Sequence, residues 1–184
     1  QELVDPFNGY KDLQDRRLRA TDDACFATDL LRVFRVGQFS GRLNATPTPE
    51  LLELCQQLTT SPAFSALPSE RVLVELEKGW MKSPDPTQAM RIWISTEAFQ
   101  TYFPELADFI TQNDSPIWSR LSTATDFRQP NAGWSMALFW SVLLYDVSKE
   151  IICSLFDRIH LQKYLGFPIR KAVLLSQHHA DTLN

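Results

Sequence analysis

The chain has 184 residues, of which 44% are hydrophobic and 22% are charged. This composition excludes an intrinsically disordered chain and is typical of a globular domain that is large enough to bury its own core. The formal net charge of -4 argues against a protein held on nucleic acid by overall basicity, because affinity for phosphates comes largely from Lys and Arg. Any contact with RNA is therefore expected to be local.

The sequence also bears on membrane insertion and on the redox state of the cysteines. The longest apolar stretch, near residues 134–145, is far shorter than the ~20 residues that cross a bilayer. No basic start followed by an apolar run marks a signal peptide. Cys25, Cys55 and Cys153 lie far apart and lack the paired spacing of zinc or redox motifs, which predicts reduced thiols. We therefore expect a cytoplasmic protein that makes no membrane contact.

Helix signals run along the whole sequence. Thr48 and Asp85 each precede a proline, which pairs a capping side chain with a backbone preset for the first helical turn. Alternation with period two is nearly absent, so no strand is expected. In chain order, helices are predicted near residues 10–16 and 29–43, from Thr48-Pro49, from Pro68-Ser69, from Asp85-Pro86, near 96–111, 116–127, 133–146 and 148–160, and from Pro168. The fold is predicted to be all-α, a multi-helix bundle or superhelix.

The first forty residues carry the most specific pattern. A turn with the sequence DPFNG begins at Asp5, and the segment from Thr28 to Phe39 reads TDLLRVFRVGQF. Further along, ERV begins at Glu70 with ELEK three residues later, and YFPEL begins at Tyr102. The order and spacing of these segments resemble the tRNA nucleotidyltransferase family, which includes CCA-adding enzymes and bacterial poly(A) polymerases.

The resemblance implies a nucleotide site on the helix near residues 29–43, which is the neck of this family. Asp29 and Arg32 occupy the positions at which the family reads the base of the incoming CTP or ATP. A carboxylate and a guanidinium three residues apart share a helical face and offer the acceptors and donors that a base edge needs. Thr28 as a helix cap and Arg35 one turn further along complete the expected site. The alternative is a structural salt bridge between Asp29 and Arg32.

Two positions depart from the family pattern. Thr28 stands where the family usually has Glu, and Gln38 stands where it has Arg. Thr28 carries no charge, and Gln38 keeps hydrogen bonding but loses a cation. Nucleotide selection is therefore expected to be altered, weakened or abolished. The apolar residues between these positions surround most of the helix, which predicts that it is buried between layers.

Two small basic clusters are the candidates for RNA contact. The first contains Arg16 and Arg19, and the second ends at Arg42. These three arginines are the predicted RNA-binding residues, because local clusters can hold phosphates in a chain that is acidic as a whole. The alternative for each of them is a solvated or ion-paired surface position.

The resemblance also divides the chain into three parts. Residues 1–45 correspond to the end of the head linker and the neck, residues 46–127 to the body, and residues 128–184 to a degenerate HD-like region. The HD motif of the family supplies a metal-binding His, and Tyr145 stands in that place. The other possible metal ligands in this region are Asp146, His160, His178 and His179, and no metal site is expected from them.

Catalytic carboxylates are missing from the sequence. No two aspartates stand two residues apart, and no glycine-rich phosphate loop is present. We therefore expect no catalytic residue and no cofactor in this chain, with Mg²⁺ held by an N-terminal nucleotidyltransferase head outside it. The expected function is the RNA-binding and nucleotide-selecting part of a tRNA CCA-adding nucleotidyltransferase, with tRNA or another RNA, CTP or ATP, and the head as partners. The alternatives are a headless, noncatalytic RNA-binding paralogue or scaffold, and part of a bacterial poly(A) polymerase.

Overall fold

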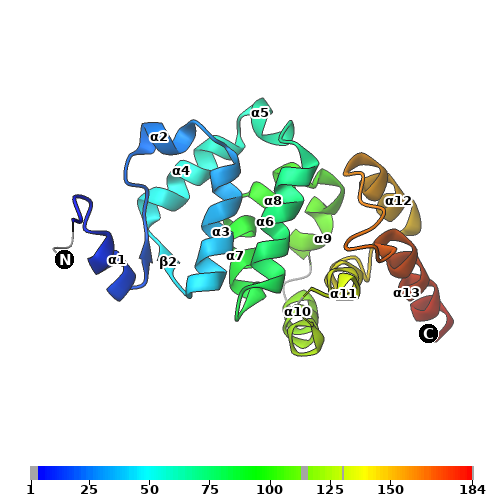
Figure 1. Cartoon of the computed structure of the whole chain (residues 1–184). Helices are drawn as coiled ribbons and strands as arrows, with labels where there is room; N and C mark the ends of the chain where they lie inside the picture. Colours follow the sequence, from blue (N-terminus) through cyan, green and yellow to red (C-terminus); the bar gives the residue numbers. More distant parts are fainter. Residues whose placement is uncertain (1–3, 113–115, 130, 184) are drawn as a thin grey trace.

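The computed structural model describes residues 4–112, 116–129 and 131–183, and within these ranges the regular secondary structure is helical except for two strands of two residues each (Figure 1). The predicted all-α class is confirmed. The elements are α1 (Gly9–Gln14), β1 (Arg17–Leu18), α2 (Asp23–Ala27), α3 (Leu31–Leu43), β2 (Thr46–Pro47), α4 (Pro49–Thr59), α5 (Pro62–Ser65), α6 (Ser69–Met81), α7 (Pro86–Ser95), α8 (Ala98–Tyr102), the 3₁₀ helix η1 (Pro104–Leu106), α9 (Ala107–Gln112), α10 (Pro116–Phe127), α11 (Gly133–Leu143), α12 (Lys149–Arg158) and α13 (Ile169–Leu183).

The predicted helix starts at Thr48 and Asp85 are confirmed. The Thr48 hydroxyl accepts a hydrogen bond from the backbone of Leu51, and the Asp85 carboxylate accepts one from Thr87. The single helix predicted over residues 96–111 is wrong. The chain forms α8, η1 and α9 there, because Pro104 has no N–H to donate and interrupts the helical ladder.

The prediction of no strand also needs a small correction. The strands β1 and β2 pair in parallel, with Arg17 opposite Thr46 and Leu18 opposite Pro47. Two-residue strands are too short to produce any alternation in the sequence. The short helices α2 and α5 were likewise not predicted. The pair of strands links the segment before α2 to the segment after α3, so it holds together the two ends of the stretch that contains these helices.

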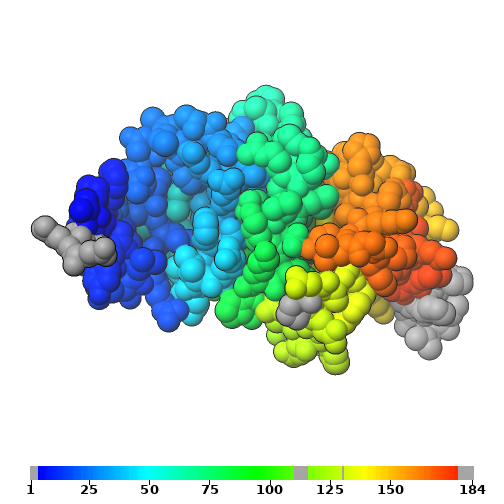
Figure 2. Space-filling view, viewed as in Figure 1, coloured from blue at the N-terminus to red at the C-terminus, as the bar shows by residue number. Residues whose placement is uncertain are grey.

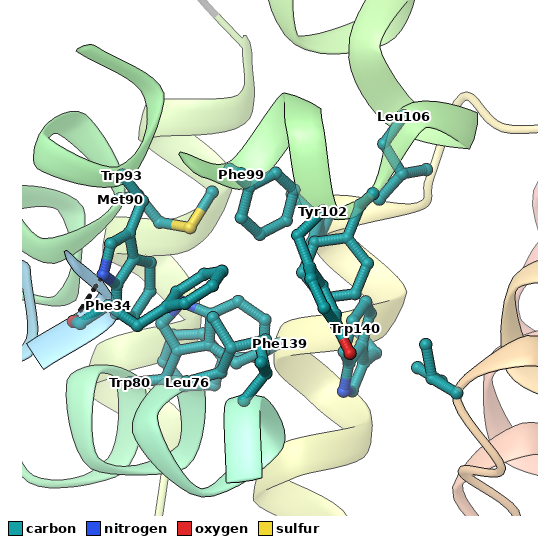
Figure 3. Packing of buried hydrophobic residues seen from close by; sticks show 14 of the residues in the cluster. Phe34, Leu76, Trp80, Met90, Trp93, Phe99, Tyr102, Leu106, Phe139 and Trp140 are labelled. Carbon is teal, nitrogen blue, oxygen red and sulfur yellow. Dashed lines mark hydrogen bonds between the residues drawn. The ribbon is translucent and has the colours of Figure 1, made fainter. Parts of the chain in front are cut away.

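The helix α3 is buried between layers, as predicted, and it packs on α6 and α7. Trp93 of α7 fixes this packing. A Cβ atom on Gly37 of α3 would lie 2.3 Å from the Trp93 ring, and one on Gly79 of α6 would lie 2.4 Å from it. The Trp93 indole nitrogen donates a hydrogen bond of 2.8 Å to the Phe34 carbonyl, drawn as a dashed line in Figure 3. Trp93 therefore packs closely against both α3 and α6 and helps to fix the inward face of α3.

Aromatic rings continue the core toward the C-terminal helices. Trp80 of α6 stacks on Phe139 of α11, with ring centroids 5.9 Å apart, and meets the edge of Trp140 at 5.3 Å (Figure 3). Trp140 in turn contacts Phe156 of α12 at 5.7 Å. The hydrophobic core therefore runs across the boundary predicted between residues 127 and 128. The division of the chain into domains stays a prediction.

The chain runs broadly from one end of the molecule to the other (Figure 1). In Figures 1 and 2, α1 and α2 lie at one end of the molecule, α3, α6 and α7 lie in the middle, and α12 and α13 lie at the other end. In the described part of the chain, no helix is long and apolar enough to span a bilayer. This arrangement places the predicted nucleotide site and the HD-like region far apart.

Candidate nucleotide and RNA site

The segment that leads into α3 holds Asp29, which was predicted to lie within that helix. The helix begins at Leu31, so Asp29 precedes it, and the Asp29 carboxylate accepts a hydrogen bond of 3.2 Å from the Leu31 N–H. Thr28 was expected to cap this helix. It lies instead at the end of α2, where its hydroxyl donates to the Cys25 carbonyl at 2.7 Å. The Asp29 carboxylate, rather than the Thr28 hydroxyl, therefore accepts the hydrogen bond from the first residue of α3.

Asp29 and Arg32 do not pair with each other, so the structure shows no intrahelical salt bridge between them. The Asp29 carboxylate pairs with Arg71 of α6, whose Nη2 lies 3.3 and 3.2 Å from the two carboxylate oxygens. Arg32 donates through Nη1 to the Cys25 carbonyl and lies 3.4 Å from the Thr28 hydroxyl. The carboxylate and the guanidinium thus bind separate partners: Asp29 binds Arg71 of α6, and Arg32 binds Cys25 of α2.

A pocket of about 240 Å³ opens beside α3, and we call it the α3 pocket. It brings together the two predicted nucleotide-binding arginines, Arg32 and Arg35, with two partly exposed aromatic rings. Val36 and Leu51 form part of its apolar wall. Its lining residues are Leu18, Arg19, Phe26, Arg32, Arg35, Val36, Phe39 and Leu51. Guanidinium groups beside aromatic faces are the chemistry that recognises a nucleotide, since the first group binds phosphate or base edges and the second stacks on bases.

Arg35 forms an ion pair with the buried carboxylate of Glu75. Its Nε lies 3.5 Å from Oε1 of Glu75, and the same oxygen accepts a hydrogen bond of 3.0 Å from Lys78. The Glu75 side chain is only 2% exposed, whereas 40% of the Arg35 side chain is exposed. An unpaired buried carboxylate is costly, so Glu75 holds Arg35 at its Nε. The Arg35 guanidinium has no other partner among the described residues.

Gln38 marks the second departure from the family pattern. It is 2% exposed, and its Nε2 has no hydrogen-bond partner among the described residues. A charged side chain at this position would carry a larger desolvation penalty than an amide. The structure therefore places Gln38 inside the helix packing rather than among the lining residues of the α3 pocket.

The three predicted RNA-binding arginines differ in their surroundings. Arg19 is bound within the chain, because its Nε lies 2.6 Å from the Asp12 carboxylate and its Nη2 donates to the Phe7 carbonyl. Arg16 makes a long hydrogen bond of 3.4 Å to the Leu43 carbonyl. Arg42 is exposed in the last turn of α3, and its side chain has no ion pair within the described ranges. Arg42 and Arg16 are therefore the more accessible cations of this set.

The HD-like segment offers few metal ligands. The Asp146 carboxylate pairs with Arg120 at 2.7 Å, and the same guanidinium lies 4.3 Å from the centre of the Tyr145 ring. His160 is exposed at a turn with a φ of 54°. The side chains of His178 and His179 lie outside the described residues. Among the residues that are described, no group of three His, Cys, Asp or Glu side chains converges on one point.

Comparison with known proteins identifies the family. No protein-family model matches the chain. A CCA-adding enzyme of Pseudomonas putida (strain W619) is 31% identical over 159 residues, which cover 85% of this chain and 40% of that enzyme. A multifunctional CCA protein of Alkalilimnicola ehrlichii is 28% identical, over 93% of this chain and 43% of that protein. The chain thus spans about two-fifths of the curated relatives that it matches.

Solved structures share the fold. A CCA-adding enzyme in complex with CTP matches 98% of this chain with a TM-score of 0.68 at 18% identity, and this chain covers 42% of it. A tRNA nucleotidyltransferase complexed with a primer tRNA and an incoming ATP analogue matches 99% of this chain with a TM-score of 0.69 at 15% identity, and 52% of it is covered. Together with the sequence relatives, these likenesses establish that the chain belongs to the tRNA nucleotidyltransferase family.

Proposed function

We propose that this chain is the nucleotide-selecting and RNA-binding part of a CCA-adding nucleotidyltransferase, and that the α3 pocket receives the incoming CTP or ATP. The free donors of Arg32 are the observation that carries the proposal. Its contacts with Cys25 and Thr28 all run through Nη1, so Nε and Nη2 have no partner in the described part of the chain. A guanidinium held at one nitrogen presents its remaining N–H groups in a fixed fork, which suits the acceptors of a base edge.

The aromatic side chains of the pocket add a stacking surface. Phe26 is half-buried and Phe39 is 41% exposed, so both rings are accessible to a flat ligand. Stacking of a base on an aromatic ring contributes about 1–3 kcal/mol and is tolerant of sequence. The rings therefore bind any nucleobase, and the hydrogen bonds of Arg32 select among them. Arg35 is left to meet the triphosphate.

Asp29 joins the proposed site as an acceptor. Its ion pair with Arg71 is largely at the surface, with 46% of the Arg71 side chain exposed. Such exposed pairs contribute only about 0–1 kcal/mol, so a base that donates to Asp29 competes with Arg71 at little cost. Arg71 also orients the carboxylate while no nucleotide is bound.

The catalytic head is the proposed partner at the N-terminal end. Apolar side chains cluster there on and beside α1, and they are exposed by 85% at Val4, 54% at Phe7 and 68% at Leu13. A head domain that packs on these side chains would remove them from water. In this proposal Mg²⁺ belongs to the carboxylates of the head, since nucleotidyl transfer needs metal ions that clamp the triphosphate.

The test is a chimera in which this chain is joined to the head of the Pseudomonas putida relative. Replacement of Asp29 by Ala is expected to lower kcat/KM for the correct nucleotide by an amount equivalent to roughly 1–3 kcal/mol, because a charged hydrogen bond is lost. The equilibrium binding of tRNA should change little, because phosphate contacts position RNA without reading bases. The measurement is kcat/KM for CTP and ATP, with Asp85→Ala as a control at a helix cap far along the chain.

Two results would contradict the proposal in different ways. In the first, Asp29→Ala leaves nucleotide choice unchanged but lowers folding stability. This would mean that the ion pair of Asp29 with Arg71 stabilises the fold and does not bind nucleotide. A folded chimera that binds tRNA and CTP but incorporates no nucleotide would favour the alternative function, a noncatalytic RNA-binding module.

A further inference from the structure

An apolar pocket of about 210 Å³ lies between α6, α11 and the loop that follows α12, and we call it the α6 pocket. Because a cavity of about 150 Å³ holds a benzene molecule, this pocket has room for one aliphatic or aromatic side chain. It shares no lining residue with the α3 pocket. Its apolar lining side chains are Leu73, Val74, Leu76, Met136, Trp140 and Leu161.

A polar atom in the wall of the α6 pocket has no partner. The Trp140 indole is fully buried, and its Nε1 forms no hydrogen bond within the described part of the chain. In Figure 3 this nitrogen lies at the end of the ring turned away from Leu106, on the same side as Leu76, which also lines the pocket. A buried donor without an acceptor is costly. An occupant that brings an acceptor, such as a peptide carbonyl, would remove this cost.

The turn beside the pocket carries an apolar side chain in an unfavourable place. Tyr164 lines the pocket, and its backbone pairs with that of Phe167 across Leu165 and Gly166. The two turn residues have φ values of 47° and 78°, and a two-residue turn with positive φ at both positions favours Asn-Gly. The Cβ of a leucine is disfavoured in this conformation, and the Leu165 side chain is 62% exposed. Neither the local backbone nor burial within this chain accounts for Leu165, whereas contact with a partner does.

The rim of the α6 pocket is acidic. Glu70 and Glu77 are lining residues, and neither forms an ion pair within residues 4–112, 116–129 and 131–183. Burial and the neighbouring Glu77 raise the pKa of the Tyr164 hydroxyl, so that group stays uncharged. The two carboxylates attract cations and repel phosphates, which disfavours a nucleic acid as the occupant.

We propose that the α6 pocket, together with Val74 and Leu165 at its edge, is a docking surface for a basic segment of another protein. One aliphatic or aromatic side chain of the partner fills the pocket, and a neighbouring main-chain carbonyl accepts the hydrogen bond of Trp140. A Lys or Arg of the partner pairs with Glu70. An apolar anchor inside a pocket, surrounded by a polar rim, is the common arrangement of protein–protein contacts. This surface stands apart from the proposed nucleotide site, because no residue lines both pockets.

The test is selection of phage-displayed random short peptides on the 184-residue chain. The retained peptides are expected to share a large apolar residue close to Lys or Arg, and their affinity is then measured by fluorescence anisotropy. Leu165→Asn should weaken their binding by about 10-fold or more. Its thermal midpoint should stay the same or rise, because Asn tolerates a positive φ better than Leu does. Glu70→Lys, at an exposed position, should turn the preference from basic to acidic peptides.

Leu175→Asn is the matched control, because Leu175 is a leucine of α13 that is 49% exposed and lies outside the α6 pocket. The proposal is supported if Leu165→Asn loses peptide binding and Leu175→Asn keeps it. Equal binding by the two variants would overturn it, as would a selection that retains only acidic peptides or none. A wild-type dimer that Leu165→Asn dissociates in sedimentation would overturn it in favour of a second copy of this chain. Weaker binding of an RNA hairpin by Leu165→Asn would overturn it in favour of an RNA contact.

Discussion

Cys55 is the residue whose surroundings most clearly alter its chemistry. It is fully buried in α4, and burial raises the pKa of its thiol to about 12. In the unfolded chain this thiol loses its proton near pH ~8.5, whereas in the folded protein it keeps its proton to higher pH. Above pH ~8.5 the unfolded state therefore binds fewer protons than the folded state. The free energy of unfolding is therefore expected to fall by ~1.4 kcal/mol per pH unit between the two pKa values, and to be unaffected by this thiol below pH ~8.5.

This pH dependence is measured by urea denaturation of the wild type and of Cys55→Ala between pH 8.5 and pH 10. The variant should lose the steep part of the fall, even if its stability is lower at every pH because a small cavity forms. Cys153→Ala serves as the control, since Cys153 is only partly buried. Equal slopes for Cys55→Ala and the wild type would show that another group causes the fall.

Single residues were predictable where their partners are close in sequence. The turn at Asp5 was predicted from DPFNG, and the carboxylate of Asp5 indeed accepts hydrogen bonds from Gly9 and Tyr10, which hold its pKa below the usual value. Asn8 in this turn has a φ of 56°, a conformation that Asn tolerates better than most residues. The partner of Asp29 was not predictable, because Arg71 lies 42 residues away and no spacing rule connects them.

The packing of α3 on α6 and α7 yields a prediction at the scale of the element. Replacement of Gly37 by Ala places a Cβ atom 2.3 Å from the Trp93 indole nitrogen, which the ring cannot tolerate without moving. Overpacking of this kind costs typically 1–3 kcal/mol, so the free energy of unfolding is expected to fall by about that amount. The loss of the hydrogen bond to the Phe34 carbonyl would add to it. Denaturant titration followed by far-UV circular dichroism measures the change.

Gly9→Ala is the matched control for this experiment. The atom nearest to a Cβ on Gly9 is an oxygen of Asp5 at 3.5 Å, which is ordinary contact, and Gly9 opens the helix α1. Alanine should be neutral or slightly stabilising there, because it has the higher helix propensity. A Gly37→Ala protein as stable as Gly9→Ala would mean that Trp93 does not fix the inward face of α3.

Elements were predictable where a start signal and an apolar period coincide. The helices after Thr48 and Asp85 were predicted from the cap and the proline that follows it, and both caps are formed. The interval from residue 96 to 111 was misjudged because its apolar spacing continues through Pro104, which breaks the hydrogen-bond ladder all the same. The parallel pair of β1 and β2 depends on contacts across about 30 residues, which no local pattern records.

At the scale of the whole molecule, the continuous core makes a prediction about folding. The rings of Trp80, Trp140 and Phe156 connect α6 to α11 and α12 without a polar gap. Arg128 strengthens the same connection, because its guanidinium donates to the carbonyls of Trp80 and Ser83. We therefore expect one cooperative transition, with tryptophan fluorescence and circular dichroism coinciding during thermal unfolding. Two separate transitions would mean that the parts divided between residues 127 and 128 fold independently.

Candidate functional residues could be predicted from the sequence where they lie close together along the chain, but not where the fold brings distant segments together. The N-terminal segments singled out Arg32 and Arg35, which both line the α3 pocket, and Asp29, which does not belong to its lining and pairs with Arg71. Their role in nucleotide binding stays a prediction. Lys149, Lys163 and Lys171, which line one groove at the C-terminal end, were not singled out, because they come from two helices and a loop and become neighbours only in the folded molecule. Local charge clusters in the sequence pointed to Arg16, Arg19 and Arg42 instead.

The most direct measurement of the central claim is nucleotide choice by the chimera with Arg32→Ala. The ratio of kcat/KM for CTP and ATP is compared with that of Arg42→Ala, which removes an exposed arginine of the same helix outside the α3 pocket. Loss of the Arg32 donors is expected to move the ratio toward one, by roughly 10-fold or more for a charged hydrogen bond, while Arg42→Ala leaves it unchanged. An unchanged ratio in a folded, active Arg32→Ala chimera would contradict the claim that the α3 pocket selects the nucleotide.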